Sequence, residues 1–499
     1  EALRAGSMAA VARPALSRPA RVRRATRAAA APVSAVARPA ARAVPGAAPP
    51  PVPKPSPAAL AAAALPLLAP RRPSVACAAA APSAVAAAAA AEKPKKPRLP
   101  ALDSIRFFLI AYISIGHFLG CACKDPTALA LFSQVNVVVG AFFVLSGYVA
   151  GYTGTLLNEY AADKRVNPPG PYIVSRIAGY YPLYLLVQVL FLPMFLFADV
   201  TYNGWAKAAW HAALTFTLSQ AWFPKSAELW NAPTWFLSAF TVCQLAMPFA
   251  LPPIAKMKKG GLRLGLAVLT FLACVAKLAY SYDLNCWGIM EGMLSPRAHP
   301  NLVFWNVVRF NPFYALVEVL MGVFAARLVM TENVKEDGSV ETESPAKGGS
   351  SLVPLVGMLA ILAYRALGWV SLNDGLTRSF IFIPLFTTFL MRLHRETVTG
   401  GGAASLASVM AWKPLVYLGT ISFPIYIIHG PLGQLFYKKV VATKLFGGTF
   451  AKYGMPFFFG WLGIVLVSAM LLHHLFVTNK SVGAATKDAV GSINKMLPQ

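Results

Sequence analysis

The sequence predicts an all-α polytopic membrane protein, a bundle of about ten or eleven transmembrane helices preceded by a disordered N-terminal leader. Two observations lead to this fold class. Hydrophobic residues make up 57% of the 499 residues and charged residues only 13%, which is about half the charged share of an average soluble domain. The apolar residues also gather in runs of roughly 20, the length that crosses the hydrocarbon core of a bilayer.

The leader, residues 1–98, is rich in Ala, Arg and Pro and contains only two acidic residues, Glu1 and Glu92. Such a composition cannot bury a core and predicts disorder. An Arg-rich, acid-poor leader is typical of organellar transit peptides, and residues 74–78 (SVACA) resemble a processing site of chloroplast leaders. The Pro-rich stretch 45–57 interrupts the amphipathic helix that a mitochondrial leader needs. We therefore expect the protein to lie in a chloroplast membrane. A mitochondrial membrane or another endomembrane is the alternative location, and the leader would then be a mitochondrial leader or a plain disordered cytosolic tail.

A transmembrane domain over residues 99–478 follows, and a short polar tail, 479–499, ends the chain. Apolar segments long enough to span lie at residues 103–123, 134–156, 173–198, 205–223, 233–254, 263–282, 306–329, 352–370, 376–394, 414–437 and 454–477. The basic residues 93–98 keep the start of the first helix on the stromal or cytosolic side by the positive-inside rule. The basic loops at 164–165 and 256–263 conflict in parity if every segment between them spans. One segment within 173–254 is therefore expected to be re-entrant or interfacial.

The net charge of +26 does not indicate a nucleic-acid partner, because more than half of it lies in the leader and the rest fits positions flanking membrane helices. Inside the first span, Arg106 and His117 are eleven residues apart, which puts both side chains on one helix face about 16 Å apart along the axis. Ionisable groups in a bilayer are costly and are usually kept for a task. The pair suggests an interior groove in which one group binds an anion and the other handles a proton. A snorkelling Arg and an unrelated core His are the alternatives.

Five short motifs occur in a recognisable order along the chain. They are Leu102-Asp103-Ser104-Ile105-Arg106 with His117, Phe142-Phe143-Val144-Leu145-Ser146-Gly147-Tyr148, Tyr172-Ile173-Val174-Ser175-Arg176 with Tyr181-Pro182-Leu183-Tyr184, Trp235-Phe236-Leu237-Ser238, and Gly419-Thr420-Ile421-Ser422-Phe423 with Ile425-Tyr426-Ile427-Ile428-His429. Together they resemble the signatures of acyltransferase family 3, multi-pass membrane enzymes that O-acylate sugars, lipids, peptides or natural products. The resemblance covers about residues 99–477. Gly179 and Phe240 depart from it, since the family usually carries an arginine and a glutamate there.

The resemblance implies three catalytic candidates. His117 would be the general base that takes the proton of an acceptor hydroxyl, because imidazole titrates near neutrality. Arg106 would bind a phosphate or another polar group of acyl-CoA with its planar fork of donors, unless it simply pairs with Asp103. Ser146 would donate to the thioester carbonyl, and the alternative is a serine bonded to its own helix backbone.

Five further residues are candidates for substrate binding: Arg176, Trp235, Glu318, Ser422 and His429. Arg176 would contact the phosphates of CoA or act as a positive-inside anchor. Glu318 is an acid within an apolar segment, so it either lines a pocket or pairs with a buried arginine. Trp235 would stack at the rim of the site or belong to the interfacial aromatic belt. Ser422 and His429 lie seven residues apart on one helix face and would line the acceptor pocket.

No metal site is predicted. The six cysteines form no CxxC pair, and the adjacent His473 and His474 point about 100° apart on a helix. With His211, His299 and His394 they are expected near membrane boundaries.

The sequence therefore predicts an integral membrane O-acyltransferase that moves an acyl group from acyl-CoA to a hydroxyl of a small-molecule, lipid, pigment or sugar acceptor. No permanently bound cofactor is expected, since acyl-CoA is a substrate. The expected partners are acyl-CoA, the hydroxylated acceptor and membrane lipid, with no nucleic acid, and the oligomeric state is left open. A transporter or flippase of a small amphiphile, and a non-catalytic relative marked by Gly179 and Phe240, are the alternatives.

Overall fold

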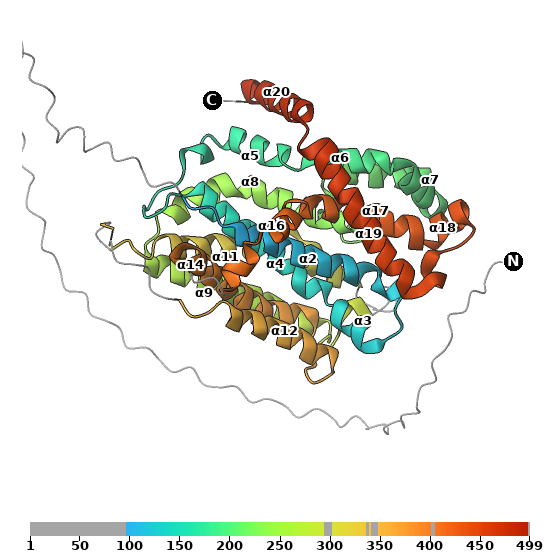
Figure 1. Cartoon of the computed structure of the whole chain (residues 1–499), viewed down its shortest axis with the longest axis horizontal. Coiled ribbons are helices and arrows are strands. Elements are labelled where there is room, and N and C mark those ends of the chain that lie inside the picture. The colour runs from blue at the N-terminus through green and yellow to red at the C-terminus, as the bar shows by residue number, and fades with distance from the viewer. Residues whose placement is uncertain (1–95, 294–301, 336–338, 341–347, 401–404, 498–499) are drawn as a thin grey trace, which may run out of the picture. The chain divides into compact units, whose positions relative to one another are not determined.

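Helices make up most of the part of the chain that the structure describes (Figure 1). The computed structural model describes residues 96–293, 302–335, 339–340, 348–400 and 405–497. The predicted transit peptide lies outside these residues. The α-helices are α2 (Pro100–Phe118), α3 (Pro126–Phe132), α4 (Val135–Gly154), α5 (Pro169–Ala178), α6 (Tyr181–Leu190), α7 (Leu192–Phe216), α8 (Trp235–Ala255), α9 (Lys259–Asp283), α10 (Leu302–Phe310), α11 (Pro312–Met330), α12 (Leu352–Ala366), α13 (Asp374–Leu376), α14 (Ile383–Thr399), α15 (Leu406–Met410), α16 (Lys413–Thr420), α17 (Ser422–Tyr437), α18 (Lys439–Phe446), α19 (Gly454–Leu472) and α20 (Lys480–Met496). The all-α membrane class is confirmed.

Within the described residues, eight helices are long and apolar enough to cross a membrane, and nine if the bent pair α16 and α17 counts as one span. The sequence predicted ten or eleven. The difference lies in two segments, 205–223 and 352–370. The first belongs to the end of α7 and the loop after it, and the second forms α12, which has only 15 residues and is too short to cross a hydrocarbon core of about 30 Å.

Helix α7 resolves the parity conflict between the basic loops. It follows the candidate span Pro169–Leu190, bends at Gly204, where φ is 78°, and exposes Tyr202 and Trp205. It does not qualify as a span, so only Pro169–Leu190 and Ala232–Ala255 cross between the two basic loops. Two crossings return the chain to its starting side, and one non-spanning segment within 173–254 is what the charge pattern required.

Buried hydrogen bonds tie several helix ends together at the basic end of the bundle. Arg327, near the end of α11, is fully buried and donates to the carbonyl oxygens of Leu156 at 2.7 Å, Glu159 at 2.8 Å and Ala255 at 3.1 Å. The ends of α4, α8 and α11 therefore meet. Lys96, just before α2, donates to the carbonyl of Tyr152 at 2.8 Å, which brings the start of α2 to the same end.

Helices α4 and α11 pack with almost no space between their backbones. A Cβ atom at Gly147 would stand 1.8 Å from the carbonyl oxygen of Val319, and one at Gly322 would stand 2.0 Å from that of Val144. Small residues permit such close helix packing in membranes. This close approach fixes Ser146, the neighbour of Gly147, relative to α11.

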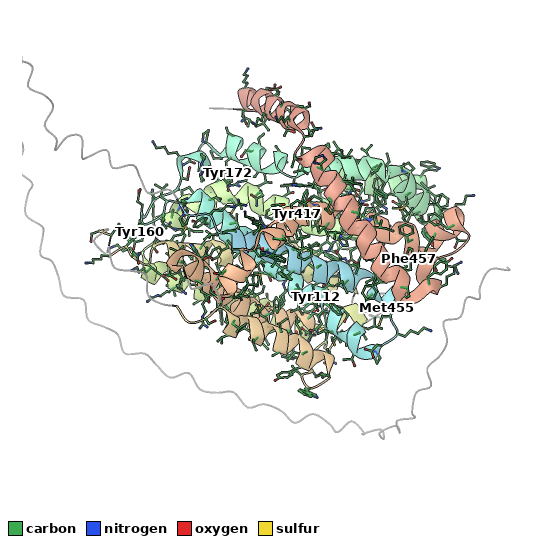
Figure 2. The ribbon with its side chains drawn as sticks, viewed as in Figure 1. Tyr112, Tyr160, Tyr172, Tyr417, Met455 and Phe457 are labelled. Carbon is green, nitrogen blue, oxygen red and sulfur yellow. The ribbon has the colours of Figure 1, made fainter. Side chains whose placement is uncertain are left out.

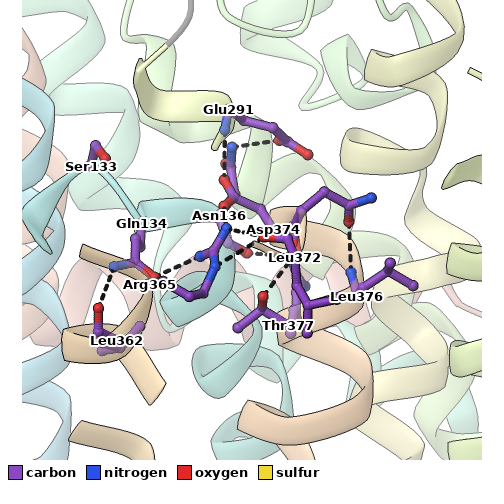
Figure 3. Close-up of polar contacts among 12 residues, drawn as sticks. Ser133, Gln134, Asn136, Glu291, Leu362, Arg365, Leu372, Asp374, Leu376 and Thr377 are labelled. Atoms are coloured by element: carbon purple, nitrogen blue, oxygen red, sulfur yellow. Dashed lines mark hydrogen bonds and ion pairs between the residues drawn. The ribbon is translucent and has the colours of Figure 1, made fainter. Parts of the chain in front are cut away.

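A buried polar network fixes the start of α4 (Figure 3). The Arg365 guanidinium donates to Gln134 Oε1 at 2.6 Å and to Asp374 Oδ1 at 2.7 Å. Asp374 Oδ2 accepts from the backbone N–H of Glu291 at 3.1 Å, and Asn136 Nδ2 donates to Glu291 Oε2 at 2.6 Å. The ion pair at its centre is almost inaccessible to solvent. It therefore holds α4, α12 and α13 in one arrangement.

Two peripheral helices complete this unit. The hydroxyl of Tyr112, which points from α2 toward α3, donates to the carbonyl of Leu131 and holds α3 against α2 (Figure 2). The polar tail forms α20, whose first N–H groups are capped by the Asn479 side chain, and it lies against α5 near the basic end.

Candidate active site

Two cavities meet at His117. The wide cavity has a volume of about 990 Å³ and is lined by α2, α7, the loop before α8, and α17. The narrow cavity has a volume of about 190 Å³ and runs among α2, α4, α8 and α17. His117, Pro233 and Trp235 line both. The imidazole of His117 therefore lies deep in the bundle and is still accessible from two sides.

Close packing of α2 on α17 brings His117 to its partner. A Cβ at Gly433 would stand 2.0 Å from the ring of Phe118, so this glycine leaves room for the ring at the end of α2. Within α17, Pro431 has no N–H to offer the carbonyl of Ile427 four residues earlier. Asn231 Nδ2 donates to that carbonyl instead, at 2.8 Å, and thereby fixes the loop before α8 against the same turn.

His117 and His429 form a hydrogen-bonded pair. His117 Nδ1 lies 3.0 Å from His429 Nε2, and the ring planes differ by 7°. His429 Nδ1 lies 2.8 Å from the carbonyl oxygen of Tyr426 and 3.2 Å from that of Ile425. Because a carbonyl only accepts, His429 Nδ1 must donate, which leaves a lone pair on its Nε2.

This arrangement assigns the tautomer of His117. Its Nδ1 must donate to His429 Nε2, so in the neutral ring its Nε2 carries the lone pair. No hydrogen bond from the described residues occupies that nitrogen. His429 itself is fully buried. The pair is therefore a base with its proton-accepting nitrogen free, oriented by a second imidazole that is itself oriented by the backbone.

Arg106 and His117 line the same narrow cavity, as their common helix face predicts. Arg106 Nη1 also pairs with Asp103 Oδ1 at 2.6 Å, so the alternative ion pair is present as well. About a third of the Arg106 side chain is exposed, and its remaining donors are available to a ligand. Most of the cavity wall between the two residues is apolar and aromatic.

Three more predicted residues lie in this cavity. Ser146 and Ser422 both line it, and neither hydroxyl has a hydrogen-bond partner among the described residues. Trp235 is buried at the junction of the two cavities, with its ring 4.8 Å from that of Phe310. Trp235 thus lies inside the bundle rather than in an interfacial belt.

A family model of acyltransferase family 3, described as an acyltransferase domain, matches residues 99–474. The chain belongs to acyltransferase family 3. The comparisons with curated proteins and with solved structures gave no match. The recognition from the five motifs is confirmed, and with it the assignment to a family of membrane acyltransferases.

Three predicted residues of this acyltransferase line neither cavity at His117: Arg176, Glu318 and His429. His429 is fully buried and contacts His117, so it does not line a pocket together with Ser422 as expected. Arg176 donates to Thr153 Oγ1 at 3.3 Å and lies over the ring of Tyr172, near the basic end. Glu318 forms a buried two-bond ion pair with Arg378, with 2.6 Å between Oε1 and Nε, so the structural alternative foreseen for it is present. The two residues that depart from the family pattern lie in different places. Phe240 lines the narrow cavity, whereas Gly179 is exposed at the end of α5.

Sequence reasoning missed Arg309 and Glu228. Arg309 lines the narrow cavity, Glu228 lines the wide one, and the two side chains pair at 2.7 Å. Arg309 precedes α11 by a few residues and belongs to none of the five motifs. Because the helix α10 that carries it is short and its partner is 81 positions away, no local pattern distinguishes Arg309 from an interfacial arginine.

Hydrogen-bonded polar side chains form one wall of the wide cavity of the acyltransferase. Asp199 accepts from Trp230 Nε1 at 2.8 Å, from Asn203 Nδ2 at 2.7 Å and from His211 Nδ1 at 2.9 Å. Burial raises the pKa of Asp199, but these hydrogen bonds outweigh it and hold the pKa below its usual value. Burial also lowers the pKa of Lys438 on the opposite wall.

Two of the histidines expected near membrane boundaries, His211 and His394, are held by partners inside the protein, and His299 lies outside the described residues. His211 is buried against Asp199, and His394 is buried with its Nδ1 2.7 Å from the Tyr148 hydroxyl. Hydropathy cannot foresee either partner: Asp199 lies 12 positions from His211, and Tyr148 lies 246 positions from His394.

Proposed function

We propose that this protein is an integral membrane O-acyltransferase that transfers an acyl group from acyl-CoA to a hydroxyl of a small-molecule, lipid, pigment or sugar acceptor. One observation carries the proposal: His117, whose Nε2 has no hydrogen-bond partner among the described residues, lines two separate cavities. A transfer between two substrates needs this arrangement, because both must reach one base from different sides.

The narrow cavity suits the thioester donor. Arg106 at one end offers a guanidinium fork to a phosphate or amide oxygen, and the roughly 16 Å from Arg106 to His117 gives the pantetheine arm a path with apolar walls. Arg176, at the basic end of the bundle, is proposed to contact the CoA phosphates outside the cavity. The positive-inside pattern supports donor entry from that end.

The wide cavity suits the acceptor. Its volume of about 990 Å³ and its polar wall of Asp199, Asn203 and Gln434 favour a substrate that carries hydroxyl groups. His429 and Ser422 take supporting roles: His429 orients the base, and Ser422 lines the donor side.

In the proposed reaction, His117 Nε2 removes the proton from the acceptor hydroxyl while the oxygen attacks the thioester carbonyl. His117 becomes an imidazolium, whose Nδ1–H bond to His429 strengthens with the charge. The oxyanion of the tetrahedral intermediate needs a donor. Ser146 and Arg309, which line the same cavity, can supply it. Collapse of the intermediate breaks the C–S bond, and the His117 proton passes to the CoA thiolate. The products are an ester and free CoA.

The test is an in vitro transfer assay with labelled acyl-CoA and purified protein in lipid. We expect His117→Ala to lose transfer by at least about 10²-fold, while His474→Ala, an exposed histidine on the last π-turn, keeps the wild-type rate. Transfer by a folded His117→Ala variant at the wild-type rate would falsify the mechanism. Comparing lipid and pigment extracts of a knockout with those of its parent identifies donor and acceptor together, because the missing ester contains both the acyl group and the acceptor.

We also propose a plastid membrane as the location, on the composition of the leader. A fluorescent fusion of the whole chain that colocalises with mitochondria instead would overturn this.

A further inference from the structure

A third cavity, of about 250 Å³, lies between α9, α10, α11 and the π-helix η9 (Thr377–Phe382). We call it the lateral cavity. It shares Arg309 with the narrow cavity but does not include His117. Nothing in the acyl-transfer mechanism uses its other side chains.

Hydrogen-bond donors without adequate acceptors converge on the lateral cavity. Lys277 is only 8% exposed, and its Nζ has no carboxylate within ion-pair distance in the described part of the chain. Its one hydrogen bond is a 3.5 Å contact to the carbonyl of Val308, and the ring of Tyr314 lies 4.9 Å away. Ser379 Oγ and Arg309 Nε are both buried with no partner among the described residues.

The nearby acid does not satisfy these donors. Glu318 also lines the cavity, but its two carboxylate oxygens accept from Nε and Nη2 of Arg378. Arg378 and Ser379 are consecutive residues of η9, and the wider π-turn, a feature frequent at functional sites, contributes both side chains to the lining. Among the described residues, the lateral cavity thus presents donors from α9, α10 and η9, and its one carboxylate is already paired with Arg378.

Leaving buried donors unpaired is costly, and a buried ammonium without a counter-ion is more so. An anionic group with several acceptor oxygens would satisfy Lys277, Ser379 and Arg309 together. A carboxylate or phosphate has this chemistry.

The mouth of the cavity indicates where this anion comes from. Leu272 on α9 and Phe313 on α11 flank it and are 50% and 61% exposed, and the outer face of α9 is apolar along its length. Lys277 lies six residues, about 9 Å, before the end of α9, off the middle of the helix, and a side chain of this length can reach from there toward the headgroups. We propose that the lateral cavity binds the phosphate of an anionic membrane lipid, whose acyl chains lie along α9.

Binding is tested with the full chain in phosphatidylcholine nanodiscs that contain increasing phosphatidylglycerol, by native mass spectrometry and by the shift in melting temperature. We expect wild type to retain one phosphatidylglycerol per chain. Lys277→Met should weaken this binding by about tenfold or more and raise the melting temperature in pure phosphatidylcholine, because it removes an uncompensated buried charge. Ser379→Ala, a smaller change at the same cavity, should weaken binding less.

Lys444→Met is the matched control, because Lys444 is exposed on α18 and its loss changes the net charge equally. Equal phosphatidylglycerol binding by Lys277→Met and Lys444→Met overturns the proposal. So does stabilisation of the wild type by inorganic phosphate with no preference for the lipid. No acyl donor is present in this measurement, so its outcome is independent of the catalytic proposal.

Discussion

Replacing His429 tests whether the second imidazole orients the first. His429→Leu keeps a side chain of similar bulk but removes the acceptor that holds His117 Nδ1–H at 3.0 Å. Without it, His117 can rotate or adopt the other tautomer, and its Nε2 lone pair is no longer fixed toward the cavities. His429→Gln is the matched variant, because a glutamine oxygen reaches nearly the position of Nε2.

The magnitude follows from how this hydrogen bond changes during the reaction. In the ground state it joins two neutral rings, whereas in the transition state it stabilises a forming imidazolium. A hydrogen bond to a charged group contributes about 1.5–3 kcal/mol, and each 1.36 kcal/mol is a factor of ten in rate. We therefore expect kcat of His429→Leu to fall about 10- to 150-fold. The KM for acyl-CoA should change little, because the lost interaction strengthens only in the transition state.

The assay is steady-state transfer with labelled acyl-CoA, with kcat and KM determined separately after size-exclusion chromatography confirms a folded protein. His429→Gln should recover most of the loss. A wild-type kcat for His429→Leu, or equal losses of kcat for His429→Leu and His429→Gln, would refute the orientation argument. Either result would mean that the rate does not depend on a hydrogen-bond acceptor at position 429.

Two further predictions concern the scaffold. Gly147→Ala should lower the free energy of unfolding by about 1–3 kcal/mol, because its Cβ would collide with the Val319 carbonyl. Chemical denaturation in detergent measures this change. Gly463→Ala on the open face of α19 is the control and should be neutral or stabilising, so equal losses of stability at both sites contradict the packing argument. Hydrogen bonds from the Arg165 guanidinium hold the pKa of Asp163 at about 2, below the unfolded value of about 3.9. The Asp163 carboxylate therefore contributes stability that is complete above pH ~4 and is lost as the pH falls through about 2. The difference in melting temperature between wild type and Asp163→Asn should shrink over this range, and a difference that stays constant with pH contradicts the assignment.

Much of the candidate site could be predicted because helical periodicity is a local property. The eleven-residue spacing puts Arg106 and His117 on one face of α2 whatever surrounds that helix, and both line the narrow cavity. Ser146 and Ser422 also reach this cavity. Their roles in binding or catalysis stay predictions, whereas the family and the all-α membrane class are confirmed.

Other features were not predictable because they depend on which helix faces meet. Glu318 is an isolated acid in the sequence, and only packing of α11 against η9 reveals Arg378 as its partner 60 positions away. Arg309 and Lys277 appear as an interfacial arginine and a helix-end lysine until their surroundings are known. The number of spans was overestimated because hydropathy does not detect the bend at Gly204 or the early end of α12.

The sequence by itself determined that this chain is a helical membrane protein of acyltransferase family 3, with a basic end and an arginine and histidine aligned on its first helix. These properties depend on composition, charge and short-range periodicity. The tertiary structure alone decided that His429, 312 positions from His117, fixes its tautomer, and that two cavities meet at His117. Both outcomes depend on how closely α2 packs against α17, which long-range packing sets and no local pattern encodes.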